Sequence, residues 1–324
     1  MNSILVYNKI PDFLLEKLEQ HCKVSYFEEI TDGNQDEFEH ELSNTNALLG
    51  AGLPITKDLF ERAPHLRYVG NISAGYDNFD IEKMTEKHVM AVNAPNALVN
   101  TTADLIFGLL LSTGRRITEL DRYVRNKQWT EAIGNARFGI DVHHKTIGII
   151  GMGRIGQAVA KRAALGFSMK VLYHKRNRDF EAEKSLGATY CELKELLQES
   201  DYVCLTLPLT DKTYHLIDEK ELLQMKSTAI LINGGRGPLV NETSLVKALE
   251  KGTITAAGLD VFEEEPLAFD SPLMAMDNVV LTPHIGSATK ETRTGMAEEA
   301  VENLLQALKG TRPNNLLNPE VLVK

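Results

Sequence analysis

A glycine cluster, Gly151-Met152-Gly153-Arg154-Ile155-Gly156, restricts the possible folds of this chain more than any other part of the sequence. It follows an apolar run, Thr146–Ile150, and precedes a helical pattern in residues 157–165. In that setting the first glycine permits a tight turn, the second admits a pyrophosphate, and the third lets the helix pack on the strand. The helix N-terminus then offers free N–H groups to the phosphates. The motif predicts a dinucleotide site; the alternative is a tight strand-to-helix turn without a ligand.

Short apolar runs alternate with helical patterns along the rest of the chain, as is typical of parallel βαβ units. The length of 324 residues fits roughly two domains at about 150 residues each. A helix that opens with the capping pattern Thr101-Thr102-Ala103-Asp104 separates two series of strands. We therefore expect an α/β protein with two Rossmann-like, doubly wound parallel sheets. The expected strands are residues 4–7, 24–27, 47–51, 68–73 and 90–93, then 146–150, 170–173, 202–207, 229–233, 256–261 and 279–282.

Composition excludes several classes of protein. Lys and Arg number 35 against 45 Asp and Glu, and the resulting net charge of −10 argues against binding to nucleic acid or to an anionic membrane surface. The cysteines, Cys22, Cys191 and Cys204, form no Cys-x-x-Cys pair, which predicts neither disulfides nor a metal site. No apolar run approaches the ~18 residues of a membrane span. We expect a soluble, cytoplasmic protein that binds no metal.

The choice of cofactor depends on the loop that follows the second strand of the later series. A site selective for NAD(H) carries Asp or Glu about 20 residues beyond the glycine motif, where it binds the ribose 2′-hydroxyl. This chain instead has Lys175 and Arg176 there, and both can pair with a 2′-phosphate. Asp179 lies too far along the chain to bind the ribose. The loop predicts NADP(H) rather than NAD(H); the alternative is a solvated basic loop.

Polar residues follow three of the later strands. Arg236 comes after residues 229–233, Glu265 lies in the turn after 256–261, and His284 comes after 279–282. The carboxyl ends of parallel strands meet at one edge, where ligands bind in open α/β sheets. Histidine can protonate the alkoxide that hydride transfer leaves, a carboxylate can orient that histidine, and arginine can bind a carboxylate. The set predicts a 2-keto acid site, although each residue singly could be structural.

These stretches resemble the D-isomer-specific 2-hydroxyacid dehydrogenase family over essentially the whole chain. The matching motifs are residues 143–148 leading into the glycine cluster, 232–237, 257–266 and 282–286. Residues 71–80 and the Lys175-Arg176 pair resemble the bacterial branch of glyoxylate, hydroxypyruvate and 2-ketogluconate reductases. Gly235 stands where the family often has Ala or Ser.

The resemblance implies a role for each site residue. Arg236, Glu265 and His284 would form the catalytic trio, with His284 as proton donor, and Arg236 and His284 would also contact substrate. Backbone N–H groups of Ala74 and Gly75 would help to hold the substrate carboxylate. Asp260 would position the nicotinamide carboxamide. The residues that bind the cofactor would be Gly151, Gly153, Arg154, Ile155, Gly156, Lys175, Arg176, Leu207, Pro208, Thr102, Gly234, Asp260 and Gly286.

The resemblance also implies a domain arrangement and an oligomer. Residues 1–99 and 288–324 would form a discontinuous substrate domain, and residues 100–287 would form an inserted dinucleotide-binding domain. Family members commonly pair as homodimers through the cofactor domain, so residues 115–141, which include the sole tryptophan, Trp129, are a candidate contact. The alternative for Trp129 is burial within its own subunit.

Two other functions remain open at this stage. One is an NAD-dependent D-2-hydroxyacid dehydrogenase of another branch, which the basic loop disfavours. The other is a non-catalytic dinucleotide sensor, because the same fold can serve as a cofactor-responsive binding protein. A sensor has no need of a proton donor, so the presence of His284 favours the enzyme.

Overall fold

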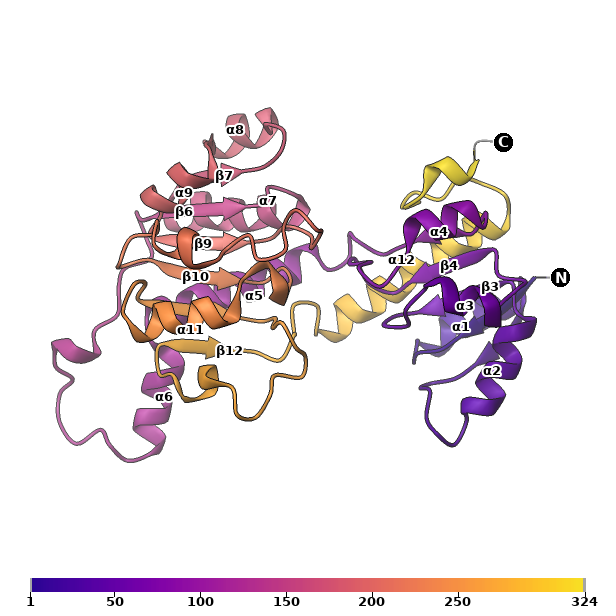
Figure 1. The fold of residues 1–324 in the computed structure, drawn as a ribbon, viewed down its shortest axis with the longest axis horizontal. Helices are drawn as coiled ribbons and strands as arrows, with labels where there is room; N and C mark the ends of the chain where they lie inside the picture. Colours follow the sequence, from indigo (N-terminus) through magenta and orange to yellow (C-terminus); the bar gives the residue numbers. More distant parts are fainter. Residues whose placement is uncertain (1, 323–324) are drawn as a thin grey trace. The chain divides into compact units, whose positions relative to one another are not determined.

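The computed structural model describes residues 2–322, and the chain divides into two compact units. One unit consists of Met1–Leu98 with Ser287–Lys324, and the other is Val99–Gly286. Each unit is built on one parallel sheet, which confirms the predicted fold class (Figure 1). The assignment of one unit to substrate and the other to cofactor stays a prediction.

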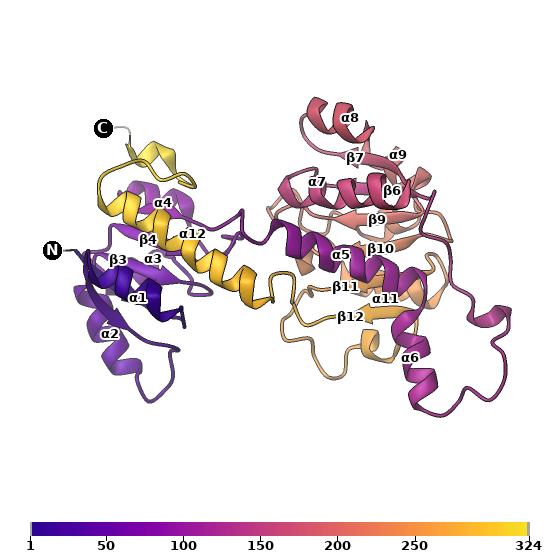
Figure 2. The same ribbon diagram turned by 180° about the vertical axis from the view of Figure 1, so that it is seen from behind.

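The first unit has a five-stranded sheet in the order β2-β1-β3-β4-β5. Leu5, Leu48 and Val69 face a buried cluster with Phe38 of α2. On the other face Gly70 lies against Leu304, and helices α1 and α12 cover that side (Figure 2). The elements are β1 (Ser3–Val6), α1 (Asp12–Glu19), β2 (Lys23–Tyr26), α2 (Gln35–Asn44), β3 (Ala47–Gly50), α3 (Lys57–Arg62), β4 (Tyr68–Asn71), α4 (Ile81–Glu86), β5 (Met90–Val92) and α12 (Lys290–Leu308).

The second unit has a seven-stranded sheet in the order β12-β11-β10-β9-β6-β7-β8. Helices α5 and α7 cover one face (Figure 2), and α9 and α11 cover the other (Figure 1). The elements are α5 (Val99–Gly114), α6 (Ile117–Arg125), β6 (Thr146–Ile150), α7 (Arg154–Lys161), β7 (Lys170–His174), α8 (Phe180–Leu186), β8 (Thr189–Tyr190), α9 (Leu193–Glu199), β9 (Tyr202–Leu205), α10 (Glu219–Leu222), β10 (Ile230–Asn233), α11 (Glu242–Glu250), β11 (Ala256–Leu259) and β12 (Val279–Leu281).

Successive strand residues of the second unit supply opposite faces of the sheet, because side chains alternate along a strand. Ile147, Cys204 and Ile232 pack with Ile106 of α5 in one buried cluster. Val203 and Leu231 point the other way and pack with Leu245 of α11. A sheet covered on both faces needs strands that are almost continuously apolar. This is why most of the strands could be predicted from apolar runs in the sequence.

The structure differs from the local expectations at the start of one helix, at one additional strand and at the ends of several strands. Helix α5 begins at Val99, so Thr101 and Asp104 lie inside it, and the Asp104 carboxylate accepts a hydrogen bond from Arg162 Nε at 2.7 Å instead of capping the helix. Strand β8, Thr189–Tyr190, was not expected, because two residues are too short to show a periodic pattern. Within residues 2–322, no helix combines the length and the apolar character that crossing a bilayer requires.

Candidate active site

The glycine turn lies at the point where the second sheet reverses its strand order. The chain runs from β6 outward through β7 to β8, and then β9 returns to the other side of β6. Gly151 follows β6 with φ +103, and a Cβ there would lie 2.8 Å from Leu207, the second residue after β9. Thr206 Oγ1 donates a hydrogen bond to the Gly151 carbonyl at 2.6 Å. Dinucleotides bind at such reversal points, so the glycine turn occupies the position that the motif predicted.

The start of α7 suits a phosphate. Gly153 precedes the helix, and among residues 2–322 no side chain caps the N–H groups of its first turn. A Cβ at Gly153 would meet nothing within 4 Å, so the backbone is open there. By contrast, a Cβ at Gly156 would collide with the Gly151 carbonyl, which shows close packing of helix and turn. Arg154 and Ile155 lie in the first turn, where free N–H groups and the helix dipole attract anions.

The basic loop after β7 differs from the expectation in one respect. Lys175 Nζ forms an ion pair with the Asp179 carboxylate at 3.1 Å, whereas Arg176 is exposed and has no ion-pair partner among residues 2–322. Asp179 also accepts a hydrogen bond from the N–H of Ala182, which with Lys175 lowers the pKa of Asp179 below its usual value. Asp179 thus caps α8 and partly neutralises Lys175, so Arg176 is the more available cation of the pair.

His284 and Glu265 form a direct pair at the carboxyl edge of the same sheet. Glu265 Oε2 lies 2.6 Å from His284 Nδ1, and Glu265 Oε1 accepts a hydrogen bond from the Phe262 N–H at 3.0 Å. The His284 backbone has φ +51, a conformation that costs energy for a residue with a side chain and is concentrated at functional sites. The carboxylate therefore contacts Nδ1, and Nε2 takes no part in this pair.

Asp260 holds the loop that carries His284. Its Oδ1 accepts hydrogen bonds from the Ile285 N–H at 2.8 Å and from the Thr282 hydroxyl at 2.6 Å, and its Oδ2 accepts one from the Gly286 N–H at 2.9 Å. The His284 N–H donates to the Asp260 carbonyl at 2.9 Å. Burial raises the pKa of the Asp260 carboxyl above its usual value, and these hydrogen bonds act in the opposite direction. Asp260 is thus a structural centre of the site as well as a candidate cofactor contact.

Arg236 lies in a loop that is held by hydrogen bonds with Asn233. Asn233, the last residue of β10, donates through Nδ2 to the Arg236 carbonyl at 2.9 Å and accepts from the Gly235 N–H at 3.1 Å. A Cβ at Gly237 would collide with the Phe262 carbonyl, so only glycine lets this loop pack against the turn that carries Glu265. The Arg236 guanidinium is half-buried and donates to the Gly235 carbonyl at 2.9 Å.

The remaining cofactor candidates of this unit lie around the same edge. Thr102 Oγ1 donates to the Gly286 carbonyl at 3.0 Å, which links α5 to the loop after β12. Gly234 packs closely on Ile106 of α5. Leu207 lies against the glycine turn, and Pro208 follows it. Their roles toward a cofactor stay predictions.

Ala74 and Gly75 belong to the other unit, in the loop after β4. The Ala74 carbonyl accepts from Asn93 Nδ2 at 2.8 Å, and the Gly75 carbonyl accepts from Asn71 Nδ2 at 2.7 Å. Within residues 2–322 the N–H groups of Ala74 and Gly75 have no acceptor. Backbone donors of this kind suit an anion such as a carboxylate.

Sequence reasoning missed several polar residues that organise these loops. Thr206, Asn233, Asn71 and Asn93 were not singled out, although each stands at or just beyond the end of a buried strand. An amide or hydroxyl at the carboxyl end of an apolar strand indicates a residue that organises the following loop, because buried polar groups need hydrogen-bond partners. That signal would have found the asparagines but not their partners.

A second histidine–carboxylate pair lies nearby in the chain but serves another purpose. His215 Nε2 lies 2.6 Å from Glu263 Oε1, and the Tyr214 ring stacks on the imidazole. The His215 N–H donates to the Pro238 carbonyl at 2.8 Å. The pair therefore ties neighbouring loops together. Within residues 2–322 no group of three or more His, Cys, Asp or Glu side chains is arranged to hold a metal ion.

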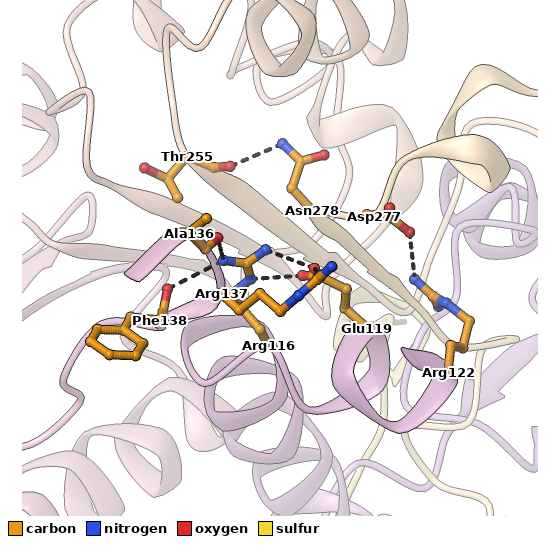
Figure 3. A network of polar contacts seen from close by, with 9 residues as sticks. All are labelled: Arg116, Glu119, Arg122, Ala136, Arg137, Phe138, Thr255, Asp277 and Asn278. Atoms are coloured by element: carbon orange, nitrogen blue, oxygen red, sulfur yellow. Dashed lines mark hydrogen bonds and ion pairs between the residues drawn. The ribbon is translucent and has the colours of Figure 1, made fainter. Parts of the chain in front are cut away.

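A cavity of about 290 Å³ lies at the opposite, amino edge of the second sheet. Its walls include Arg116 and Glu119, which form an ion pair at 2.7 Å, and Phe138 (Figure 3). Asn278 donates to the Thr255 carbonyl at 3.0 Å beside it. Strands β10 and β11 begin beside the cavity and end at the carboxyl edge of the sheet. The glycine turn and His284 lie at that carboxyl edge, so the cavity is on the opposite edge from them.

The chain is similar to known proteins along nearly its whole length. Residues 107–286 match the family described as D-isomer specific 2-hydroxyacid dehydrogenase, NAD binding domain. A glyoxylate/hydroxypyruvate reductase B of Yersinia pestis (strain Pestoides F) is 51% identical over 321 residues, which is 99% of this chain and 98% of that protein. A protein of Thermus thermophilus has a crystal structure with TM-score 0.88 and 39% identity, covering 97% of this chain and 99% of that one. An NADPH-dependent glyoxylate/hydroxypyruvate reductase of Sinorhizobium meliloti, in complex with NADP and malonate, has TM-score 0.84 and 30% identity, covering 99% of this chain and 97% of that one.

Proposed function

This chain belongs to the D-isomer-specific 2-hydroxyacid dehydrogenase family, and on that premise we propose that it reduces small 2-keto acids to D-2-hydroxy acids with NADPH. The substrates we propose are glyoxylate, hydroxypyruvate and 2-ketogluconate. The observation that carries the proposal is the 2.6 Å pair of His284 with Glu265 at the carboxyl edge of the sheet that also holds the glycine turn. A proton donor beside a dinucleotide site is what carbonyl reduction requires.

The residues present fit a nicotinamide dinucleotide. The turn at Gly151 and the uncapped start of α7 suit its pyrophosphate, and the exposed guanidinium of Arg176 suits a 2′-phosphate. Asp260 keeps a second acceptor site on Oδ2, which could receive the carboxamide of the nicotinamide. When bound, the reduced cofactor supplies the hydride that adds to the carbonyl carbon of the substrate.

The protein's own groups handle the proton and the charge. His284 donates the Nε2 proton to the carbonyl oxygen as that oxygen becomes an alkoxide, and Glu265 holds Nδ1 so that the ring keeps this orientation. Arg236 pairs with the carboxylate and polarises the adjacent carbonyl. The N–H groups of Ala74 and Gly75 bind the same kind of charge. After turnover, His284 regains its proton from solvent.

The proposal is tested by initial rates of cofactor oxidation with NADPH and with NADH, using glyoxylate, hydroxypyruvate and 2-ketogluconate in parallel. Turnover that favours NADPH is expected. Turnover with NADH alone would support an NAD-dependent dehydrogenase of another branch. Cofactor binding without turnover of any keto acid would support a dinucleotide sensor.

Arg176→Ala is expected to lower kcat/KM for NADPH by about 10- to 100-fold, because a charged hydrogen bond to phosphate contributes about 1.5–3 kcal/mol. The value for NADH should stay unchanged, since NADH has no 2′-phosphate. Lys175→Ala should have the smaller effect, because Asp179 already holds that ammonium group. The measurement is steady-state kinetics with both cofactors at saturating glyoxylate.

Arg178→Ala is the matched control, because Arg178 lies in the same loop but is paired with Glu183 at 2.6 Å. It should leave the NADPH to NADH ratio close to that of the wild type. Equal losses with NADPH and NADH in Arg176→Ala would show that the loop does not read the 2′-phosphate.

We also propose that the protein is a homodimer that pairs through residues 115–141. Helix α6 contains no buried residue, and Trp129 is 62% exposed, so burial of this side chain within its own unit is excluded. Ile117, Val124 and Phe138 of the same segment are exposed as well. Aromatic side chains in such a position are common at the centre of subunit contacts.

Trp129→Ala is expected to weaken the dimer by at least about 10-fold in dissociation constant, as truncation of a tryptophan hot spot typically does. Sedimentation equilibrium over a range of protein concentrations measures the effect. Phe269→Ala serves as control, because Phe269 is 98% exposed and lies outside the segment. A wild-type protein that stays monomeric would refute the dimer.

We place the enzyme in the cytoplasm as part of the same proposal. Cys22, Cys191 and Cys204 are free, buried thiols, and such usage suits a reducing compartment.

A further inference from the structure

The loop after β4 has an unusual arrangement of backbone hydrogen bonds. Three consecutive carbonyl groups are bonded: Ser73 accepts from the Ala94 N–H at 3.0 Å, Ala74 from Asn93 Nδ2 at 2.8 Å, and Gly75 from Asn71 Nδ2 at 2.7 Å. Two of the three donors are side-chain amides. The loop is therefore held by side chains where a strand or helix would use backbone groups.

The geometry of the peptide bond gives these contacts a consequence. In a trans peptide the C=O and the N–H of one unit point in opposite directions. The carbonyls of residues 73, 74 and 75 share peptide units with the N–H groups of Ala74, Gly75 and Tyr76. Within residues 2–322 these three N–H groups have no hydrogen-bond acceptor. A hydrogen bond that fixes one of these carbonyls therefore also fixes the direction of the N–H group on the same peptide unit.

Both asparagines are buried. Asn71 is 1% exposed and Asn93 is 4% exposed. The Asn93 carbonyl accepts a hydrogen bond from Asn303 Nδ2 at 3.2 Å, which anchors it to α12. Asn71 Oδ1 is buried and has no hydrogen-bond partner within residues 2–322, a cost that an apolar side chain would avoid. An asparagine at position 71 therefore needs a reason, and the hydrogen bond from its Nδ2 to the Gly75 carbonyl provides one.

We propose that Asn71 and Asn93 are positioning residues, whose amides orient the N–H groups of Tyr76 and Gly75 so that these, with the N–H of Ala74, form one binding site for a carboxylate. This inference rests on the proposed function, in which the substrate is a 2-keto acid. It adds Tyr76 as a third backbone donor, and it assigns to each asparagine the donor that it controls. Successive backbone N–H groups without a partner in the protein can attract an anion without any charged side chain.

The test uses Asn71→Leu and Asn93→Leu in the full chain, because leucine keeps the branched shape of asparagine and removes the donor. We expect the inhibition constant of oxalate and the KM for glyoxylate to rise by about 10- to 100-fold, as for loss of a charged hydrogen bond. The dissociation constant of NADPH should stay unchanged, and kcat should fall by less than about fivefold, because the asparagines act on the carboxylate and not on the transferred proton.

Asn318→Leu is the matched control. Asn318 is a fully buried asparagine of the same unit, and its Nδ2 donates to the Val89 carbonyl at 2.8 Å, away from the loop. The Asn318→Leu variant shows how the loss of a buried amide outside the loop affects the stability of the unit. Its inhibition constant for oxalate should equal that of the wild type. Thermal melts verify that each variant folds; if the leucine variants do not fold, Asn71→Ser and Asn93→Ser take their place with the same expectation.

Direct oxalate binding, followed by calorimetry, separates this inference from the proposed function. If the wild type binds oxalate but reduces no keto acid, and the variants lose that binding, the positioning role stands and the proposed reaction fails. If folded variants bind oxalate as tightly as Asn318→Leu does, or if the wild type binds no oxalate, the positioning role is overturned.

Discussion

His284→Ala is expected to lower kcat by about 10²- to 10⁴-fold, the range for loss of a positioned general acid. The reason is that the proposed mechanism delivers the proton from His284, whose Nδ1 lies 2.6 Å from the Glu265 carboxylate that orients the ring. Binding of NADPH should be unaffected, because the loop backbone around His284 is held by Asp260 and not by the imidazole. Single-turnover absorbance at the nicotinamide band measures the chemical step, and fluorescence titration measures binding.

His215→Ala provides a matched control for this experiment. His215 also faces a carboxylate at 2.6 Å, in the same unit, but its partner is Glu263 and it binds loops together. We expect less than about a tenfold change in kcat, with some loss of thermal stability. If both histidine variants lost activity equally, or if His284→Ala turned over like the wild type, the assignment of His284 as proton donor would be wrong.

Arg236→Ala is expected to lower kcat/KM for glyoxylate by about 10²- to 10⁴-fold. A guanidinium that binds a carboxylate through two charged hydrogen bonds contributes about 3–6 kcal/mol at 1.5–3 kcal/mol each. The loss should appear in both KM and kcat, because the same group binds the carboxylate and polarises the carbonyl. Arg236→Lys should recover only a small part, since an ammonium group lacks the planar fork.

Arg162→Ala is the control for the arginine. Arg162 is also partly buried and donates to a backbone carbonyl, that of Ala158 at 2.8 Å, but it lies at the end of α7. It should cost stability rather than activity. An Arg236→Ala protein with wild-type kcat/KM would remove Arg236 from the mechanism.

The strands show how far a linear pattern can be interpreted. Residues 146–150 were predicted with the bounds of β6, because the apolar run is bordered by a lysine and a glycine. The runs at 202–207 and 256–261 were predicted too long, since β9 ends at Leu205 and β11 at Leu259. The apolar residues beyond those ends, such as Val261, are buried by loop packing and not by the sheet, and composition does not distinguish the two.

The candidate site shows a similar division. Histidine, glutamate and arginine were singled out because each follows a strand, and the structure brings His284 and Glu265 into contact. The neutralisation of Lys175 by Asp179 was not foreseen, because a helix cap and an ion pair on one carboxylate depend on how α8 is placed. The hydrogen bond from Asn71 to the Gly75 carbonyl could likewise not be predicted from the sequence.

The sequence by itself determined the parallel α/β class, the dinucleotide turn and the chemical types of the site residues, because these depend on local periodicity and on glycine at positions where a side chain does not fit. Tertiary structure alone decided which cation of the basic loop is available and which amides hold the loop at Ala74. The physical reason is that a hydrogen bond depends on distances of a few tenths of an ångström between groups far apart in the chain. A residue pattern specifies the donors and acceptors, and only packing selects the pairs.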